Sequence, residues 1–423
     1  MAESFSEVLI KFVSCVPSIP LPNELDVSMV MPATTTRDEL VDLLNLALNK
    51  NSQHQWLLVI NSKIFSTNLK DFLTTSALSS ENVLEICYYL PQSESLLDFA
   101  FDTPEIPFRL YSYQNKILVL SYHGNLFIYN QTENLSFKPF VTIYGNEFGV
   151  LNLKEVKNGI FVGVTESGVI IKYDVGYAVD NPLRAQKATI IASLELPSKA
   201  NAFTFNNENT RLAIGTQSGD IFLVIDLLGK TSLFTDVEGI TEDNFQTIHV
   251  ADVPIRFLSF LECKIDRLYY IVICLSNGAL VLFDYIVGEI THTGANGSPI
   301  SSACMDSKKL IIGSMSGSIR RYEVSNNGFS LLNVYSCHSA AITSIISFSG
   351  SLDSAKKLAV SSNSGLLYIF NSEINEKIAT IDVNTIMPKH GFEHYYFTAT
   401  DLMKVDEYLY IATSRNEVHK AKI

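Results

Sequence analysis

The pattern most suggestive of catalysis lies near the end of the chain, where residues 390–394 have the sequence HGFEH. Two histidines and a glutamate at this H-x-x-E-H spacing can converge on a zinc ion, but only when the segment is helical. Pro388 and Gly391 disfavour a helix, and the aromatic run 395–397 is typical of a strand. We therefore predict a connecting loop here rather than a metal site.

Two other segments contain only fragments of catalytic motifs. Gly229-Lys230 lacks the upstream glycine-rich segment whose backbone N–H groups would hold phosphates. Segment 313–317 (GSMSG) has Met315 where a nucleophile elbow requires serine, so it is interpreted as a turn. No set of Asp, Glu, Asn or His recurs at matching positions. We therefore predict that the protein is not an enzyme, carries no intrinsic cofactor and takes no small-molecule substrate.

The bulk composition indicates a folded, acidic protein. The chain has 423 residues, of which 47% are hydrophobic and 18% charged, and its formal net charge is −13. No run of four Lys or Arg occurs, so any RNA association is expected to be indirect. No uninterrupted apolar stretch reaches the roughly 18 residues of a membrane helix. Six scattered cysteines indicate reduced thiols rather than a disulfide framework or a structural zinc site.

Residues 1–91 have the element order of a β-grasp, ubiquitin-like domain. The predicted strands share runs of β-branched and aliphatic residues and cover 7–15, 25–31, 56–60, 64–65 and 83–89. A helix is predicted to begin at the Thr36-x-x-Glu39 capping box and to end near Asn49. A one-turn helix is expected at 67–72, and Pro91 closes the domain.

From Lys116 onward one sequence pattern recurs about seven times. It consists of an apolar strand, a polar turn and a second apolar strand, followed by an aromatic or aliphatic residue and then an acid or amide. The turn residues are Gly124, Gly168, Gly219, Gly278, Gly317, Gly365 and Asn416. The closing pairs are Tyr129-Asn130, Tyr173-Asp174, Ile225-Asp226, Phe283-Asp284, Tyr322-Glu323 and Phe370-Asn371. A spacing of roughly 40 to 60 residues suits one four-stranded blade per repeat. We predict a mainly β protein in which residues 92–423 form a seven-bladed β-propeller, with an irregular β-sandwich as the alternative.

The two ends of this repeat region are expected to meet. The last repeat stops at its third strand, 417–423, so its outer strand would be missing. We expect residues 96–101 to supply that strand, because this pairing would remove the free sheet edge.

The repeats resemble the WD-repeat family, although the Trp-Asp pair is replaced throughout and the sole tryptophan, Trp56, lies in the first domain. The family's Gly-His pair survives best at Cys337-His338-Ser339. A ubiquitin-like domain ahead of such a propeller resembles a family of ribosome-assembly factors with a Notchless-like (NLE) domain. The matching residues are Phe12, 58–61 (LVIN), Ile64-Phe65, 67–69 (TNL) and 77–86 (ALSSENVLEI).

This resemblance implies a role in large-subunit (60S) ribosome biogenesis and pre-rRNA processing, in the nucleolus and nucleoplasm. The family has a Notchless type and a PeBoW type, which binds a block-of-proliferation-type WD protein and a pescadillo-type protein; the match to the second is closer. In both types the first domain docks onto the midasin ATPase, which pulls the factor from pre-60S particles.

The resemblance also assigns a docking loop of Leu78, Ser79, Ser80 and Glu81, in which Glu81 would complete the coordination of a Mg²⁺ held by midasin. Mg²⁺ prefers six oxygen ligands, so a partner carboxylate can fill an open position. By local sequence alone, Glu81 is a solvated acid before a strand. A WD-type scaffold in another complex and a Notchless-type role remain alternatives, because the chain lacks the family's basic character and a nuclear-localisation cluster.

Overall fold

The structure is a computed structural model, and its described elements are mostly strands grouped in eight sheets. None of the described helices is long and apolar enough to cross a membrane. The described residues are 6–14, 27–48, 56–60, 63–65, 67–76, 83–89, 97–131, 138–145, 147, 149–184, 186–224, 245–263, 266, 268–336, 338–349, 356–371, 376–383 and 398–423.

The first sheet is mixed, with strand order β2-β1-β5-β3-β4. Its elements are β1 (Glu7–Ser14), β2 (Met29–Pro32), α1 (Arg37–Ala47), β3 (Leu57–Ile60), β4 (Lys63–Ile64), α2 (Leu69–Ser76) and β5 (Leu84–Tyr89). β1 and β2 pair antiparallel, with Glu7 opposite Pro32 and Ile10 opposite Met29. β1 also pairs with β5 in parallel, so the first and last strands of this unit lie side by side at its centre.

Helix α1 begins where the capping box predicts. The Thr36 side chain accepts from the backbone N–H of Glu39, and the Glu39 carboxylate accepts from the N–H of Thr36. This exchange satisfies two backbone donors that the first helical turn leaves unpaired. The apolar face of α1 then buries Leu40 and Leu44 against the sheet.

Helix α2 corrects the sequence prediction, since it covers 69–76 rather than a single turn at 67–72. Asn68 sets the start, because its side-chain oxygen accepts from the N–H of Asp71 at 2.8 Å. Leu69 and Phe72 are buried in the core of this unit, which gives the helix its packed face.

Seven further sheets follow, and six of them have four antiparallel strands. Sheet 1 contains β7 (Pro107–Tyr113), β8 (Lys116–Ser121), β9 (Leu126–Asn130), β10 (Val141–Tyr144) and the parallel strand β14 (Gln186–Lys187). Sheet 2 contains β11 (Val150–Lys157), β12 (Ile160–Thr165), β13 (Val169–Asp174) and β15 (Thr189–Ser193). Sheet 3 contains β16 (Ala200–Phe205), β17 (Leu212–Thr216), β18 (Asp220–Val224) and β19 (Phe245–His249).

The remaining sheets repeat this order. Sheet 4 contains β20 (Ile255–Cys263), β21 (Leu268–Leu275), β22 (Ala279–Asp284) and β23 (Glu289–Ala295), and sheet 5 contains β24 (Ile300–Asp306), β25 (Lys309–Ser314), β26 (Ser318–Ser325) and β27 (Gly328–Ser336). Sheet 6 contains β28 (Ile342–Ser349), β29 (Lys356–Ser362), β30 (Leu366–Asn371) and β31 (Glu376–Asp382). Sheet 7 contains β32 (Ala399–Val405), β33 (Tyr408–Thr413), β34 (Glu417–Lys422) and β6 (Leu97–Asp102).

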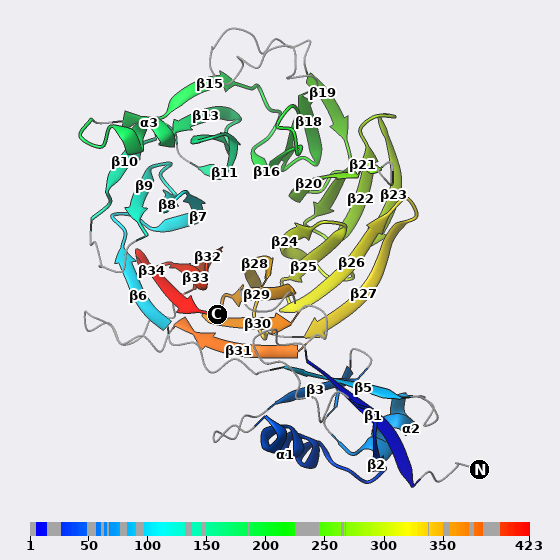
Figure 1. Cartoon of the computed structure of the whole chain (residues 1–423). Coiled ribbons are helices and arrows are strands. Elements are labelled where there is room, and N and C mark those ends of the chain that lie inside the picture. The colour runs from blue at the N-terminus through cyan, green and yellow to red at the C-terminus, as the bar shows by residue number, and fades with distance from the viewer. Residues whose placement is uncertain are drawn as a thin grey trace.

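The seven sheets follow one another around a ring, an arrangement consistent with propeller blades (Figure 1). The ring closes as predicted, because β6 pairs antiparallel with β34 and completes sheet 7. Phe101 of β6 also stacks on Tyr129 of sheet 1, with ring centroids 4.0 Å apart. The predicted domain boundary at residue 91 lies outside the described residues.

One insertion was not predicted. Helix α3 (Val175–Asp180) follows β13, and Asp174, predicted only as a closing acid, caps it by accepting from the N–H of Tyr177. The chain then returns through β14, which pairs in parallel with β10 of sheet 1. The insertion thus joins sheets 1 and 2 on the outside of the ring.

The predicted turn residues all lie between the second and third strands of their sheets, and all have positive φ, from +63° at Asn416 to +98° at Gly278. Glycine adopts this backbone region without strain. At Gly219 a Cβ atom would also lie 1.6 Å from the carbonyl oxygen of Ala251, so no other residue fits there.

Tyrosines of the closing pairs link neighbouring sheets. The hydroxyl of Tyr173 in sheet 2 donates to the carbonyl of Gly124 in the turn of sheet 1, at 2.7 Å. The hydroxyl of Tyr129 in sheet 1 donates to the carbonyl of Asp102 in sheet 7, at 3.0 Å. These tyrosines satisfy backbone acceptors of the sheet before them. The pair at 225–226 lies outside the described residues.

Sheet 3 contains a chain of hydrogen-bonded polar side chains. The Ser218 hydroxyl donates to one Asp220 oxygen at 2.6 Å, and the other oxygen lies 2.7 Å from His249 Nδ1. The Asp220 side chain holds the pKa of His249 above its ordinary value of 6.5. His338, by contrast, is buried and stacks on Tyr368 at 4.2 Å, and burial lowers its pKa to about 4.

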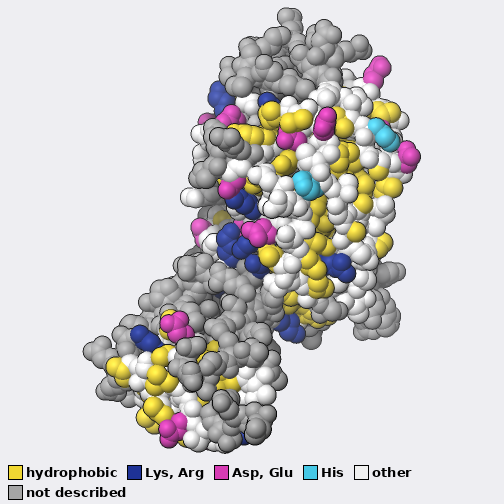
Figure 2. Space-filling model, turned by 90° about the vertical axis from the view of Figure 1, so that its right-hand side faces the viewer, with side chains coloured by type: hydrophobic (Ala, Val, Ile, Leu, Met, Phe, Trp, Pro, Cys, Tyr) yellow, Lys and Arg dark blue, Asp and Glu magenta, His cyan; other side chains and the backbone are white. Residues whose placement is uncertain are grey.

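The outer surface of sheets 4 and 5 carries exposed apolar side chains. They lie in or beside β23 and β27 and are Ile286, Val287, Ile290, Leu331, Leu332 and Val334. We call this set the apolar band; hydrophobic side chains run across this face in Figure 2.

Replacing Tyr173 by phenylalanine should destabilise the protein by about 1 to 2 kcal/mol, because the buried carbonyl of Gly124 loses its donor. Urea unfolding measures the change. Tyr177→Phe is the matched control, since the Tyr177 side chain is 43% exposed and its hydroxyl bonds only at the surface, to Arg184. Equal losses in the two variants would contradict the assigned role of the buried hydroxyl.

Asp220→Asn should lower the pKa of His249 toward 6.5, as measured by NMR titration of the imidazole. Because the folded-state pKa is raised, the pair contributes stability below pH 6.5 and loses it as the pH rises through the raised pKa. Asp252→Asn is the control, because this exposed carboxylate lies 3.6 Å from Nε2 and should shift the pKa less. An unchanged pKa in Asp220→Asn would rule out the pair as its cause.

Candidate functional site: the central channel

Three of the segments singled out in the sequence fall outside the described residues. The docking loop Leu78, Ser79, Ser80 and Glu81 falls between the end of α2 and the start of β5. The HGFEH segment and Gly229-Lys230 also fall outside them. Segment 313–317 is described and is a turn between β25 and β26, as predicted, with the N–H of Gly317 donating to the carbonyl of Ser314.

The innermost strand of every ring sheet carries the same irregularity. In each sheet the pairing with the second strand shifts at the second residue of the inner strand, which leaves one bulged residue. The bulged residues are Phe108, Leu151, Asn201, Arg256, Ser301, Thr343 and Thr400. A β-bulge twists its strand and redirects side chains, so seven of them alter the inner wall at one level.

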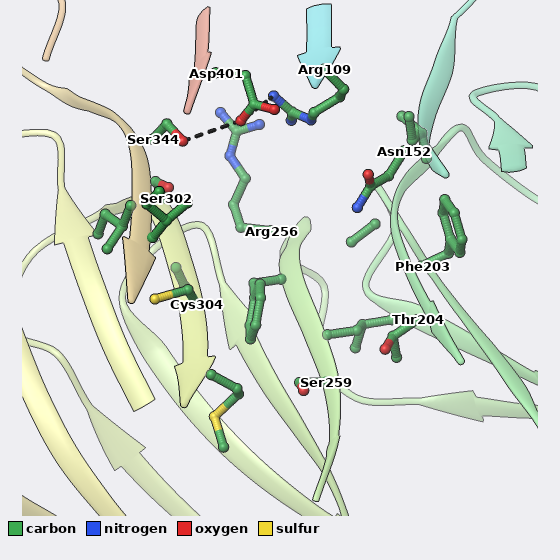
Figure 3. A pocket seen from close by; sticks show the side chains of 18 of the residues that line it. Arg109, Asn152, Phe203, Thr204, Arg256, Ser259, Ser302, Cys304, Ser344 and Asp401 are labelled. Atoms are coloured by element: carbon green, nitrogen blue, oxygen red, sulfur yellow. Dashed lines mark hydrogen bonds and ion pairs between the residues drawn. The ribbon is translucent and has the colours of Figure 1, made fainter. Parts of the chain in front are cut away.

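The inner strands enclose a cavity of about 490 Å³ at this level. Three charged side chains line it: Arg109 of β7, Arg256 of β20 and Asp401 of β32. Figure 3 shows the three converging on one part of the channel, with Asn152 and Ser302 nearby. A volume of this size lies within the range of small-ligand sites.

Asp401 joins three neighbouring sheets at this wall. One carboxylate oxygen accepts from the N–H of Leu110 in sheet 1 at 2.9 Å, and the other accepts from the Ser344 hydroxyl in sheet 6 at 3.2 Å. The Arg109 guanidinium lies 4.0 Å away. The Asp401 side chain is 14% exposed, yet enclosure by surrounding protein raises the pKa of its carboxyl above the ordinary range, against the opposing effect of Arg109.

Tyr111 makes a similar link on the other side of Arg109. Its hydroxyl accepts from the N–H of Leu153 in sheet 2 at 2.7 Å and donates to the Asn152 side chain at 2.5 Å. Thr400 of sheet 7 likewise donates to the carbonyl of Pro107 in sheet 1. Several channel side chains therefore bind backbone groups of the adjoining inner strand.

The channel offers no activated nucleophile among its described thiols. Burial, followed by the charge of Asp306, raises the pKa of Cys304 to about 12, so this thiol stays protonated at neutral pH. Within the described residues, no group of three or more His, Cys, Asp and Glu side chains could hold a metal ion.

No pattern in the sequence marks the residues of the channel. Arg109, Arg256 and Asp401 occupy nearby positions of three inner strands, but their types differ and no motif connects them. An alignment of the seven inner strands by their turns would have brought these positions together. The bulges that direct their side chains into the channel would still have been invisible.

Comparison with known proteins identifies the fold and no family. No protein-family model matches the sequence, and no curated protein is significantly similar to it. The computationally designed protein Ika8 has a similar crystal structure, with a TM-score of 0.52 and 12% identity over 77% of this chain and all of Ika8. In total 1715 chains of solved structures match, so the fold is too common to indicate a function.

Asp401→Ala should destabilise the protein by about 1 to 3 kcal/mol, because the Leu110 N–H loses its acceptor in a confined space. Asp401→Asn keeps an oxygen for that N–H and should lose less. Thermal or urea unfolding gives the order, with Asp98→Ala, an exposed site on β6, as the control. An Ala variant no less stable than the control would contradict the role assigned to Asp401.

Proposed function

We propose that this chain is a non-enzymatic protein-binding scaffold in the assembly of the large ribosomal subunit. In this proposal residues 1–91 are a β-grasp, ubiquitin-like domain, and residues 92–423 are a seven-bladed WD-type propeller. The observation that carries it is the sheet order β2-β1-β5-β3-β4, with the parallel pair β1 and β5 at its centre, ahead of seven ring sheets. That arrangement supports the resemblance to the NLE-containing assembly factors.

The surface of the ring supports a scaffold role. Large exposed apolar patches on soluble proteins mark contact surfaces for other proteins. The apolar band is a patch of this kind, with six exposed apolar side chains in or beside the neighbouring outer strands β23 and β27. The partners proposed for the ring are a block-of-proliferation-type WD protein and a pescadillo-type protein on pre-60S particles. With a net charge of −13, the chain would reach RNA through these partners.

In this proposal midasin binds residues 1–91 and pulls on the factor through them. Leu78, Ser79, Ser80 and Glu81 precede β5, which pairs with both β1 and β3. A loop joined to a central strand transmits force into the whole sheet. We propose that Glu81 supplies a carboxylate to a Mg²⁺ held by midasin, and that the factor works in the nucleolus and nucleoplasm.

Glu81→Ala should abolish Mg²⁺-dependent recovery of midasin in pulldowns from nuclear extract, because the metal would lose a ligand. Recovery is read by mass spectrometry with Mg²⁺ and again with EDTA. Glu7→Ala, an exposed acid on β1, is the matched control and should behave as the wild type does.

The same pulldown separates the alternatives. Equal recovery of midasin by wild type and by Glu81→Ala would contradict the proposal that Glu81 is a ligand of the Mg²⁺ held by midasin. Recovery of the block-of-proliferation-type and pescadillo-type proteins would favour the PeBoW role over the Notchless role. Recovery of none of the three proteins would contradict ribosome assembly and leave a WD-type scaffold of another complex.

A further inference from the structure

The polar side chains of the channel differ in the hydrogen bonds that they make. Asp401, Ser344, Tyr111 and Thr400 are engaged in hydrogen bonds between inner strands. Arg256 is not. It is the bulged residue of β20, it is exposed, and its side chain reaches across the channel toward Arg109 and Asp401 (Figure 3). In the part of the chain that the structure describes, no carboxylate lies within 4.0 Å of its guanidinium nitrogens.

Arg109 also has donors to spare. One of its nitrogens donates to the carbonyl of Phe108 at 3.2 Å, and its contact with Asp401 is loose, at 4.0 Å. A guanidinium has five N–H donors in a planar fork that matches the oxygens of phosphate or carboxylate. Two such groups facing one cavity form a strong oxyanion site when the competing carboxylate is otherwise engaged.

Asp401 competes weakly for these guanidinium groups. Both of its oxygens already accept hydrogen bonds, from Leu110 and Ser344. Two arginines and one aspartate are the charged residues that line the cavity, so on a chain whose net charge is −13 the channel is a local region of positive charge.

We propose that the central channel binds a phosphate group, held between the guanidinium groups of Arg256 and Arg109. Asn201 and Ser302, on the inner strands next to Arg256, line the same cavity and supply an amide and a hydroxyl. A phosphate fits a site with two guanidinium groups better than a carboxylate ligand would. A phosphate carries more negative charge and has three or four acceptor oxygens. The phosphate comes either as a free small molecule or on a phosphorylated side chain of a partner. The site stands independently of the ribosome-assembly role.

The test is titration of the full-length protein with inorganic phosphate at constant ionic strength, followed by calorimetry and by thermal unfolding. Wild type should bind saturably, and Arg256→Gln should weaken binding roughly tenfold to a hundredfold, the loss expected for one charge-assisted contact. Arg256→Lys keeps the charge without the fork and should bind with intermediate affinity. Arg184→Gln, an exposed arginine outside the channel, should bind like the wild type.

Absence of saturable binding by the wild type would overturn the proposal, as would equal binding by Arg256→Gln. The melting temperature without phosphate shows that each variant is folded before binding is compared. A second titration uses a short phosphoserine peptide. Tighter binding of the peptide than of inorganic phosphate supports a site for a partner's phosphorylated side chain, and binding of inorganic phosphate alone supports a site for a free phosphate compound.

Discussion

Seven edge strands meet at the centre of the ring, and their backbone groups impose the constraint on which the rest of the fold depends. The innermost strand of each sheet pairs on one side only, so half of its N–H and C=O groups face the channel. Such groups need partners in a confined space. Asp401, Tyr111 and Thr400 provide them by bonding the backbone of the adjoining strand. The fold therefore requires a polar lining in the channel, whether or not the channel has a function. Arg256 differs from these three residues because, within the described residues, its side chain bonds no backbone group of an adjoining strand.

Farther from the channel, the second strands and their turns are stabilised in a different way. The second strands are buried and almost continuously apolar, as in Ile117–Leu120 and Leu310–Ile312. The turn of sheet 1 accepts a hydrogen bond from the Tyr173 hydroxyl of the next sheet, and the turn of sheet 2 is held by the buried Thr165, which accepts from the N–H of Val169. Hydrophobic packing between sheets supplies most of the stability, and these few polar links set the order and spacing of the sheets. Residues other than tryptophan thus make these links between sheets.

What the sequence could predict follows from how local each feature is. The capping box of α1 and the turn residues of the ring sheets depend on neighbouring residues, and both predictions are confirmed. Strand β6 was predicted because a missing outer strand demands a partner. The inner-strand bulges depend on pairing with another strand, so no single run of residues reveals them, and the channel residues were missed with them. Helix α2 was placed too early because the cap at Asn68 was overlooked, and α3 lacked a strong apolar pattern. The docking loop rests on resemblance and lies outside the described residues.

The closing strand has a mechanical consequence. Residues 97–102 complete sheet 7 from the far end of the sequence, so tension applied to the chain ahead of β6 reaches the ring through the pairing of β6 with β34. That pairing lies at the outer edge, and the stack of Phe101 on Tyr129 joins β6 to sheet 1. Detaching β6 would uncover β34 and break the stack of Phe101 on Tyr129, while Asp401 and Thr400 would still link sheet 7 to sheet 1. The strand that completes the circle is therefore also the one that a pull from its N-terminal side would strip from the ring first.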